Sequence, residues 1–475
     1  MKKHFFIATF FLFALSSGVN AQASKFNGDW LGTLNVGVEL RVVFHIKETG
    51  PNSFITTADS PDQSAYGMKC DSTGISGNSI TIVMSSLNAT YTGKLVNDST
   101  IDGTFTQQAS FPLVLKKTDK IIERVRPQTP TAPFAYKTED LQYDNADRSA
   151  KLAATIAIPQ GAGPFPAVLL ITGSGPQDRD ETIMDHKLFA VLADHLTKKG
   201  FIVLRVDDRG IGKSTGNFAL ATSADFAKDV SSGVDYLLSR PEVDKKKIGL
   251  LGHSEGGMIA PMVAVQRKDI NFIILLAGPG VKILDLMAEQ NEAIARSSGL
   301  SETALKEIKP LFRKIASAIM GAPDSATAIK NVSAALETWA AGKSEELLEE
   351  LHFETKEDRL SYVTEMVNQF QSPWFKYFMS FDPQPWLEKL NCKVLALNGD
   401  KDIQVISSQN LPGIEAALKK GRVKTYEIKE LKGLNHLFQS CKTCTVDEYG
   451  ELEETVSPTV LEIIAGWLEK NIKEL

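Results

Sequence analysis

Short, continuously apolar runs alternate with helical stretches over the second half and more of this chain, and this alternation constrains its fold most. Strands that are apolar throughout are typical of a parallel sheet covered on both faces by helices. The pattern therefore predicts a doubly wound α/β domain with a mostly parallel sheet. The predicted strands are Leu152–Ile158, Ala167–Thr172, Ile202–Val206, Ile248–Leu251, Phe272–Leu276, Val394–Asn398 and Val423–Ile428, and the predicted helices between them are Lys187–Lys199, Ala224–Leu238 and Gly256–Gln266.

The region before this domain has a different pattern. From Phe26 to about Lys117, short alternating runs are broken by Gly, Asn, Asp and Ser about every ten residues, which indicates antiparallel β structure. The run Gly28-Asp-Trp30-Leu-Gly32 resembles the opening of lipocalin-like barrels. We expect Trp30 to plug a small barrel or sandwich, with ligand binding as the alternative.

These patterns divide the chain into parts. Residues 24–120 are predicted to form the all-β domain, and residues 121–140 a stiff linker with three closely spaced prolines. Residues 141–284 and 386–475 are the two parts of the α/β core. Residues 285–385 lack strand patterns and are predicted to form a helical cap, whose aromatic cluster at 374–379 either packs the cap or lines an acyl pocket.

The first 21 residues have the features of a signal peptide. Lys2 and Lys3 precede an apolar run from Phe5 to Leu15. Val19 and Ala21 are small residues at the two positions that a signal peptidase recognises. The run is too short to anchor the chain in a membrane, and no Cys follows it as a lipid attachment site. We predict an exported protein, periplasmic or secreted, without a membrane anchor.

Charge and cysteine content exclude several classes of function. The formal net charge of −6 argues against nucleic acid or an anionic membrane as a partner. No His or Cys pattern typical of zinc occurs, so no metal or cofactor is expected. Cys441 and Cys444 are either bridged or a free pair. The oligomeric state stays open.

The sequence Leu250-Leu-Gly-His-Ser-Glu-Gly-Gly257 lies where a predicted strand ends and a predicted helix begins. A nucleophile elbow needs this context, because its turn is so tight that the residues two before and two after the serine must be glycine. The N-terminus of the following helix contributes partial positive charge. Ser254 is the predicted nucleophile.

A serine hydroxyl needs a histidine base, and the base needs a carboxylate that orients it. The strand at Val394 ends in a turn that contains Asp400 and Asp402, of which we favour Asp402 as the acid. Of the seven histidines, only His436 follows it, in the chain order Ser, acid, His. The other histidines considered, His253, His186 and His195, are expected to have structural roles.

The oxyanion hole should use the backbone N–H of Glu255, the residue after the nucleophile, and one from the loop that follows an earlier strand. The loop Thr172-Gly-Ser-Gly-Pro176 supplies it, with Ser174 favoured and Gly175 as the alternative. We expect Arg179, just beyond, to form a structural ion pair with Asp178 or Asp180.

From about Tyr136 onward, the chain resembles the α/β-hydrolase superfamily, and within it exported bacterial carboxylesterases related to the serine aminopeptidase and dienelactone hydrolase groups. The motifs that carry the resemblance are Gly173–Asp180, Asp208–Ser214, Gly252–Gly256, Gly399–Asp402 and Asn435-His436. The resemblance implies a serine-dependent carboxylesterase that forms an acyl-enzyme on Ser254 and cleaves small-molecule esters. An aminopeptidase or dipeptidyl-peptidase with the same triad is the alternative, and a ligand-binding protein without activity is the least favoured.

Overall fold

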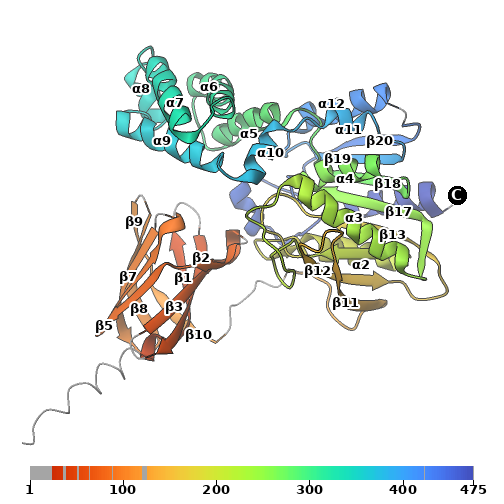
Figure 1. Cartoon of the computed structure of the whole chain (residues 1–475), viewed down its shortest axis with the longest axis horizontal. Helices are drawn as coiled ribbons and strands as arrows, with labels where there is room; N and C mark the ends of the chain where they lie inside the picture. The colour runs from red at the N-terminus through yellow and green to blue at the C-terminus, as the bar shows by residue number, and fades with distance from the viewer. Residues whose placement is uncertain are drawn as a thin grey trace, which may run out of the picture. The chain divides into compact units, whose positions relative to one another are not determined.

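The computed structural model describes residues 24–473 except 36–38, 51–52, 64, 88, 108, 120–125 and 422. The predicted signal peptide, residues 1–21, lies outside the described residues. The chain forms two compact units, one up to residue 125 together with Ile183–Asp185, the other comprising residues 126–182 and 186–475 (Figure 1). No described helix has the length and apolar character needed to cross a membrane.

The first unit is a ten-stranded antiparallel sheet in the order β4-β3-β2-β1-β10-β8-β7-β6-β5, with β9 paired to β8. Thr73 of β5 donates a hydrogen bond to Thr56 of β3 at 2.6 Å, which brings the two ends of the sheet together as a small barrel. The strands are β1 (Gly28–Asn35), β2 (Glu39–Gly50), β3 (Ser53–Ser60), β4 (Ala65–Lys69), β5 (Ser72–Ser76), β6 (Ser79–Met84), β7 (Ala89–Asn97), β8 (Thr100–Gln107), β9 (Ala109–Pro112) and β10 (Leu115–Thr118).

Trp30 is fully buried in this barrel, and its indole N–H donates to the carbonyl of Phe26 at 2.7 Å. Phe44 lies opposite Trp30 on the paired strand and contacts Tyr91, with ring centroids 5.4 Å apart. The tryptophan thus fills the barrel interior at the level of this aromatic group, because a buried indole needs both apolar neighbours and an acceptor for its N–H.

The second unit contains an eight-stranded sheet in the order β11-β12-β16-β13-β17-β18-β19-β20. Every pair from β16 to β20 is parallel, and β11 and β12 join antiparallel at one edge. The predicted α/β fold class is confirmed. The strands are β11 (Lys137–Asp144), β12 (Lys151–Ile158), β13 (Phe165–Ile171), β16 (Ile202–Val206), β17 (Val243–His253), β18 (Ile270–Leu276), β19 (Lys393–Gly399) and β20 (Tyr426–Leu431), and a two-stranded ribbon consists of β14 (Thr182–Ile183) and β15 (His186–Lys187).

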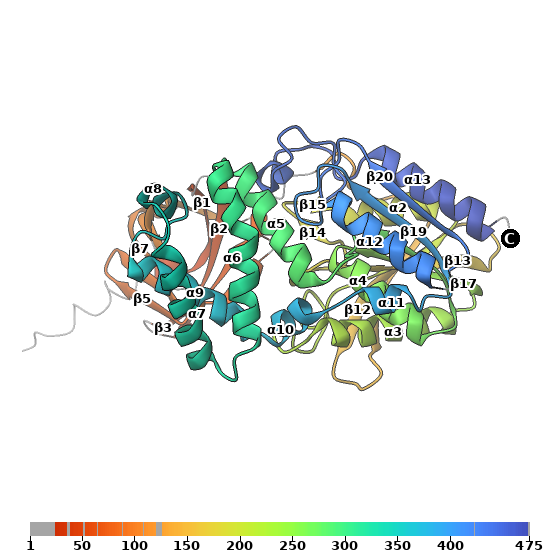
Figure 2. The same cartoon turned by 90° about the horizontal axis from the view of Figure 1, so that it is seen from above.

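Helices cover both faces of this sheet. The connection from β13 to β16 runs one way along the sheet and the later connections run the other way, so right-handed crossovers place α2 (Leu188–Lys198) opposite α3 (Ser223–Ser239) and α4 (Glu255–Gln266). The helix α13 (Pro458–Leu468) packs beside α2, and α12 (Ser407–Lys420) packs on β19 and β20 (Figure 2).

Three expectations from the sequence need correction. β11 begins at Lys137, within the range expected to be linker, and β12 is antiparallel to its neighbours. The edge strand β11 alternates exposed and half-buried positions and carries charged residues, so it lacks the apolar run that marks a central strand. The last strand lies about three residues later than predicted, at Tyr426–Leu431, because its side chains are mostly half-buried.

The segment expected to be a stiff linker is bonded to the second unit. Arg126 is buried, and its guanidinium donates to the carbonyls of Gly450 and Leu452 at 2.7 and 2.9 Å. Gln128 bonds the backbone of Thr455 and Val456. Residues 126–182 therefore belong to the α/β unit.

Seven helices occupy the stretch between β18 and β19, where the helical cap was predicted. Figure 1 shows α6 to α9 as a cluster of their own, with α5 and α10 between this cluster and the sheet. The helices are α5 (Ile283–Ser297), α6 (Glu302–Met320), α7 (Ser325–Ala340), α8 (Glu345–Glu350), α9 (Lys356–Gln369), α10 (Pro373–Ser380) and α11 (Gln384–Leu387).

Candidate active site

The strand order locates the site. β13 is the point at which the order of connections reverses, with β16 on one side and β17 on the other. Helices that leave in opposite directions open a crevice at the carboxyl ends of these strands, where doubly wound folds bind ligands. Thr172 and Gly173 follow β13, and Ser254 follows β17 directly. The predicted nucleophile therefore lies at the switch point of the sheet.

Ser254 has the backbone conformation of a nucleophile elbow. Its φ of 52° and ψ of −117° are strained for a residue with a side chain, and its N–H donates to the carbonyl of Leu276 at 2.8 Å. A Cβ on Gly252 would lie 2.0 Å from the carbonyl oxygen of Gly256, and a Cβ on Gly256 would lie 2.1 Å from that of Ile171. Both glycines are thus required by close backbone contacts.

The structure brings Asp402 and His436 together. Nδ1 of His436 lies 2.8 Å from Oδ2 of Asp402, and both side chains are buried. Oδ1 of Asp402 accepts the backbone N–H groups of Gln404 and Val405, both at 2.8 Å, which fixes the carboxylate. An acceptor at Nδ1 holds the proton there and leaves Nε2 as the basic nitrogen.

Asp400, the competing acid, points elsewhere. Its carboxylate accepts the backbone N–H of Gly433 at 2.7 Å and lies 3.4 Å from the ammonium of Lys432. It therefore holds the turn at the start of the loop that carries His436, while Asp402 contacts the imidazole itself.

His253 connects three loops of the site. Its Nδ1 lies 2.9 Å from Oε1 of Glu181, and its Nε2 lies 3.0 Å from the carbonyl oxygen of His436. Both partners accept hydrogen bonds, so both ring nitrogens donate and the ring is an imidazolium. Burial lowers the pKa of His253, but the charge and hydrogen bond of Glu181 outweigh it and the pKa is raised. The same Glu181 oxygen accepts the N–H of Gly173 at 2.6 Å, so this ion pair joins the loops after β13, β17 and β20.

His186 and His195 have the structural roles expected of them. His186 is buried, with its ring nitrogens 2.9 Å from the hydroxyl of Thr455 and the carbonyl of Tyr449. His195 lies 3.6 Å from Glu462 near the end of α2.

The loop after β13 is held by buried acids that sequence reasoning did not single out. Asp208 accepts the hydroxyl of Thr172 at 2.9 Å and the N–H of Gln177 at 3.0 Å. Burial raises the pKa of Asp208 well above its usual range. Because the N–H of Gly173 is bonded to Glu181, Gly173 does not serve as an oxyanion donor, and Ser174 and Gly175 stay the predicted candidates.

Arg179 forms its ion pair with a different partner from the one expected. The guanidinium bonds both carboxylate oxygens of Asp207, at 2.9 and 2.7 Å. Asp178 instead accepts from Thr182, and Asp180 bonds Arg205. Asp207 lies about 30 residues along the chain, so local spacing gave no signal for this pair.

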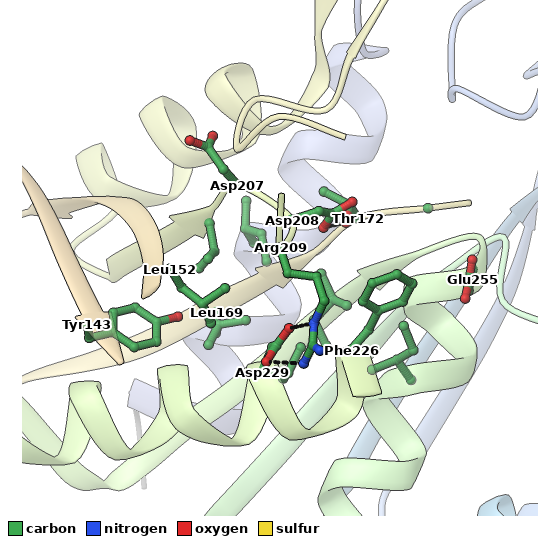
Figure 3. Close-up of a pocket in the computed structure, with 16 residues that line it drawn as sticks. Tyr143, Leu152, Leu169, Thr172, Asp207, Asp208, Arg209, Phe226, Asp229 and Glu255 are labelled. Carbon is green, nitrogen blue, oxygen red and sulfur yellow. Dashed lines mark hydrogen bonds and ion pairs between the residues drawn. The ribbon is translucent and has the colours of Figure 1, made fainter. Parts of the chain in front are cut away.

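A largely apolar pocket lies behind this loop (Figure 3). Figure 3 shows Asp208 beside Thr172, with Glu255 on the same side of the view and Tyr143 on the opposite side, and the ion pair of Arg209 with Asp229 of α3. Ser254, Asp402 and His436 do not line it. The pocket is therefore separate from the predicted triad, and among its acids Asp208 bonds the loop after β13.

The side chain of Glu255 links the elbow to the cap. Its buried Oε1 accepts the hydroxyl of Ser223 at 2.5 Å and the indole N–H of Trp374, on cap helix α10, at 2.9 Å. Burial raises the pKa of Glu255, while its hydrogen bonds to Ser223, Trp374 and Ser174 oppose the rise. Trp374 stacks on Phe378, with ring centroids 4.9 Å apart. The aromatic cluster of the cap therefore contacts Glu255, the residue after Ser254, through the indole of Trp374.

We expect Glu255→Gln to be more stable than the parent chain at alkaline pH. The raised pKa means that folding favours the protonated acid, so its stabilising effect is full below the unfolded pKa and is lost as pH rises through the folded pKa. Each unit of difference between these pKa values corresponds to about 1.4 kcal/mol. Urea unfolding between about pH 3 and about pH 9, at roughly unit steps that start below the unfolded glutamate pKa of about 4.3, gives the difference in free energy of unfolding between the two proteins.

The same change should also remove a loss of kcat on the alkaline side, because ionised Glu255 would place negative charge beside the developing oxyanion. Glu349→Gln, at an exposed position on α8, is the matched control and should leave both profiles unchanged. Superimposable pH profiles for Glu255→Gln and the parent would contradict this assignment.

The described residues contain one group with the spacing of a metal site, Cys441, Cys444 and Glu448. The two cysteines form a disulfide, and Glu448 accepts the backbone N–H groups of Lys442 and Cys444. Bridged sulfurs are not thiolate ligands, so this group is a stabilised loop and does not fit a metal ion.

A strained serine at the switch point of a mostly parallel sheet, with a bonded Asp and His on the following strand ends, defines the α/β-hydrolase superfamily. More specifically, residues 147–411 match the family described as X-Pro dipeptidyl-peptidase (S15 family). This match covers more than half of the chain, and the chain belongs to that family.

Individual relatives cover less of the chain. It is 35% identical over 166 residues to esterase EstD of Thermotoga maritima, a match spanning 34% of this chain and 39% of that protein. It is 26% identical over 176 residues to acyl-coenzyme A thioesterase 3 of Mus musculus, spanning 35% of each. The matched region is thus between a third and two fifths of the length of these relatives. Among solved structures, an esterase of Pyrococcus furiosus gives a TM-score of 0.44 at 14% identity, covering 74% of this chain and 99% of that one.

Proposed function

We propose that this protein is a serine carboxylesterase. Ser254 attacks the ester carbonyl while Nε2 of His436 takes its proton, and the same proton then passes to the departing alcohol. Water, activated by His436, hydrolyses the acyl-enzyme and returns the serine. Asp402 orients the imidazole and stabilises its charged form. The backbone N–H groups of Glu255 and Ser174 stabilise the oxyanion.

The observation that carries this proposal is the 2.8 Å contact of His436 Nδ1 with Asp402, in the loops next to the strained Ser254. A buried carboxylate on Nδ1 keeps that nitrogen protonated, so that Nε2 is free to accept a proton. The esterase activity named for EstD, the relative at 35% identity, agrees with an ester substrate.

A dipeptidyl-peptidase is the second candidate, since the chain belongs to the S15 family. Such an enzyme needs a carboxylate that pairs with the substrate's ammonium group. The carboxyl of Glu255, next to the nucleophile, is already bonded by Ser223 and Trp374, and burial favours its neutral form. In the acidic run of α8, Glu350 is bonded to Ser301, and Glu345, Glu346 and Glu349 are exposed. These contacts favour an ester substrate over a peptide.

Trp374 and Phe378 support an apolar or aromatic acyl group, because they extend the cap's aromatic cluster to the elbow. In an apolar pocket, a difference of one methylene between two substrates is worth about 1–3 kcal/mol, or roughly 10- to 200-fold in kcat/KM. We therefore expect p-nitrophenyl esters to be cleaved with a kcat/KM at least about tenfold above that of Xaa-Pro naphthylamides.

The comparison uses one preparation of the full chain, p-nitrophenyl esters of increasing acyl length, and both aminoacyl and Xaa-Pro naphthylamides. Ser254→Ala, assayed in parallel, measures contaminating hydrolases. A preference for Xaa-Pro naphthylamides would replace the esterase proposal with the peptidase, and turnover of neither class would refute both.

We further propose that the protein is exported and works in the periplasm or outside the cell. The charge and apolar pattern of residues 1–21 supports this, as does the disulfide between Cys441 and Cys444, because disulfides persist in oxidising compartments. N-terminal sequencing of the exported chain should begin at Gln22, and a chain retained in the cytoplasm with Met1 would contradict it.

A further inference from the structure

The barrel of the first unit has a hollow end. Trp30, Phe44 and Tyr91 fill one level of the interior. Beyond them, along the inward-facing positions of β1 and β2, lie Leu34 and Leu40, which are paired across the hairpin. At this end the barrel contains a cavity of about 540 Å³.

The cavity is lined mainly by apolar side chains from most strands of the barrel. Its apolar residues are Leu34, Leu40, Val42, Ala58, Met68, Met84, Leu87, Phe105 and Phe111, and its polar residues are Asp59, Ser60 and Gln107. Pockets for small molecules in proteins have volumes of about 300–1,000 Å³ with this kind of lining. Interiors are otherwise packed at the density of organic crystals, so an unfilled volume of this size forfeits stability unless a ligand occupies it.

The polar residues of the lining indicate the charge and polar groups of the ligand. Asp59 is the one charged residue among the described residues that line the cavity, and it is acidic. Its carboxylate is bonded to Nε2 of His45 at 2.9 Å and to the N–H of Gly67 at 2.7 Å. The nearby guanidinium of Arg41 is paired with Asp62, at 2.6 Å. The lining therefore provides hydrogen-bonding groups but no cation for a ligand carboxylate, because Arg41 pairs with Asp62 and His45 is held between Asp59 and Asp29.

We propose that this cavity binds one uncharged molecule with an acyl chain, such as a fatty ester or a monoacylglycerol. The chain occupies the space between the leucine, methionine and phenylalanine side chains, and each buried methylene strengthens binding roughly fourfold. The hydroxyl or ester group lies near Ser60 and Gln107. Free fatty acids should bind more weakly, because no cation in the lining would pair with their carboxylate beside Asp59.

This inference goes beyond the proposed esterase and does not depend on it, because binding is measured without turnover. The test uses the full chain carrying Ser254→Ala, which cannot hydrolyse the probe. Nile red, an uncharged dye, reports occupancy by fluorescence, and 1-monolauroylglycerol and dodecanoate compete with it. We expect saturable binding of one dye per chain and a dissociation constant for monolauroylglycerol at least tenfold below that for dodecanoate.

Two variants on the same strand locate the site. Ala58 is buried in the lining and Ile55 is 57% exposed, so Ala58→Phe fills the cavity and Ile55→Phe adds the same side chain outside it. Compared with the Ser254→Ala chain alone, monolauroylglycerol should bind at least tenfold more weakly when Ala58→Phe is added. Its affinity should be unchanged when Ile55→Phe is added. Equal affinities of the two variants would overturn the site, and competition by dodecanoate as strong as that by the ester would overturn the ligand class.

A second measurement leaves the barrel unaltered, in case Ala58→Phe fails to fold. An alkyl ester that bears a terminal diazirine is bound to the Ser254→Ala chain, photolysed, and its adducts are mapped by peptide mass spectrometry. Adducts on the peptides that contain Met68, Met84 and Phe105 support the proposal. The proposal is overturned if all adducts lie within residues 126–475. It is also overturned if excess monolauroylglycerol does not reduce the formation of any adduct.

Discussion

Replacing Ser254 with alanine is expected to lower kcat for p-nitrophenyl esters by about four to six orders of magnitude. The reason is that the serine, its base and the acid act as one unit, so loss of the nucleophile leaves only the rate that binding and the oxyanion hole provide. Alanine keeps a Cβ at the strained φ of 52°, so the elbow itself should be retained. Stopped assays over long incubation, with KM determined separately, measure the effect.

Labelling with a fluorophosphonate gives an independent readout of the same residue. The parent chain should take up one label and Ser254→Ala none. Ser239→Ala, at an exposed serine on α3, is the matched control and should be labelled like the parent. Full labelling of Ser254→Ala, or retained turnover, would mean that another residue is the nucleophile.

Asp402→Asn is expected to lower kcat by about 10³- to 10⁴-fold with little change in KM. An amide in place of the carboxylate donates toward Nδ1 of His436, which moves the ring proton to Nε2 and removes the base. The backbone N–H groups of Gln404 and Val405 can still bond the amide oxygen, so the turn should keep its shape. Rates at several pH values above 7 separate this tautomer effect from a simple change in the basicity of His436.

Asp400→Asn is the matched control, since it makes the same change two residues earlier in the same turn. Asp400 bonds Gly433 and not the imidazole, so we expect its kcat to stay close to that of the parent. A large loss for Asp400→Asn together with a small one for Asp402→Asn would reverse the assignment of the acid.

Much of the site was predictable because its signals are local. The elbow is encoded in eight consecutive residues. Gly252 is required by a contact with Gly256 inside this motif, whereas Gly256 is required by the close approach of Ile171 on β13. His436 was identified by order along the chain. The carboxyl end of β19 carries both Asp400 and Asp402, and spacing alone did not decide between them; the direction of each side chain did.

The acids that hold the site were not predictable from spacing. Glu181 contacts His253 from 72 residues away, and Trp374 reaches Glu255 across 119 residues. A buried carboxyl group and an exposed one have the same appearance in a sequence, and only burial and the partners given by folding separate them. Arg179 and Asp207 illustrate the same point, because the pairing depends on how two loops meet.

The sequence by itself determined the α/β fold class and the antiparallel β character of the first unit, because the period of apolar residues follows directly from strand and helix geometry. It left open whether that first unit is a barrel or a sandwich. It also determined Ser254, through a motif whose glycines have a steric cause. Only the tertiary structure decided that Asp402 faces His436, that Glu181, Asp208 and Glu255 are buried around the loop after β13, and that one end of the barrel is hollow. Those features depend on distances between residues far apart in the chain, and on volumes that side chains leave unfilled, which no local pattern specifies.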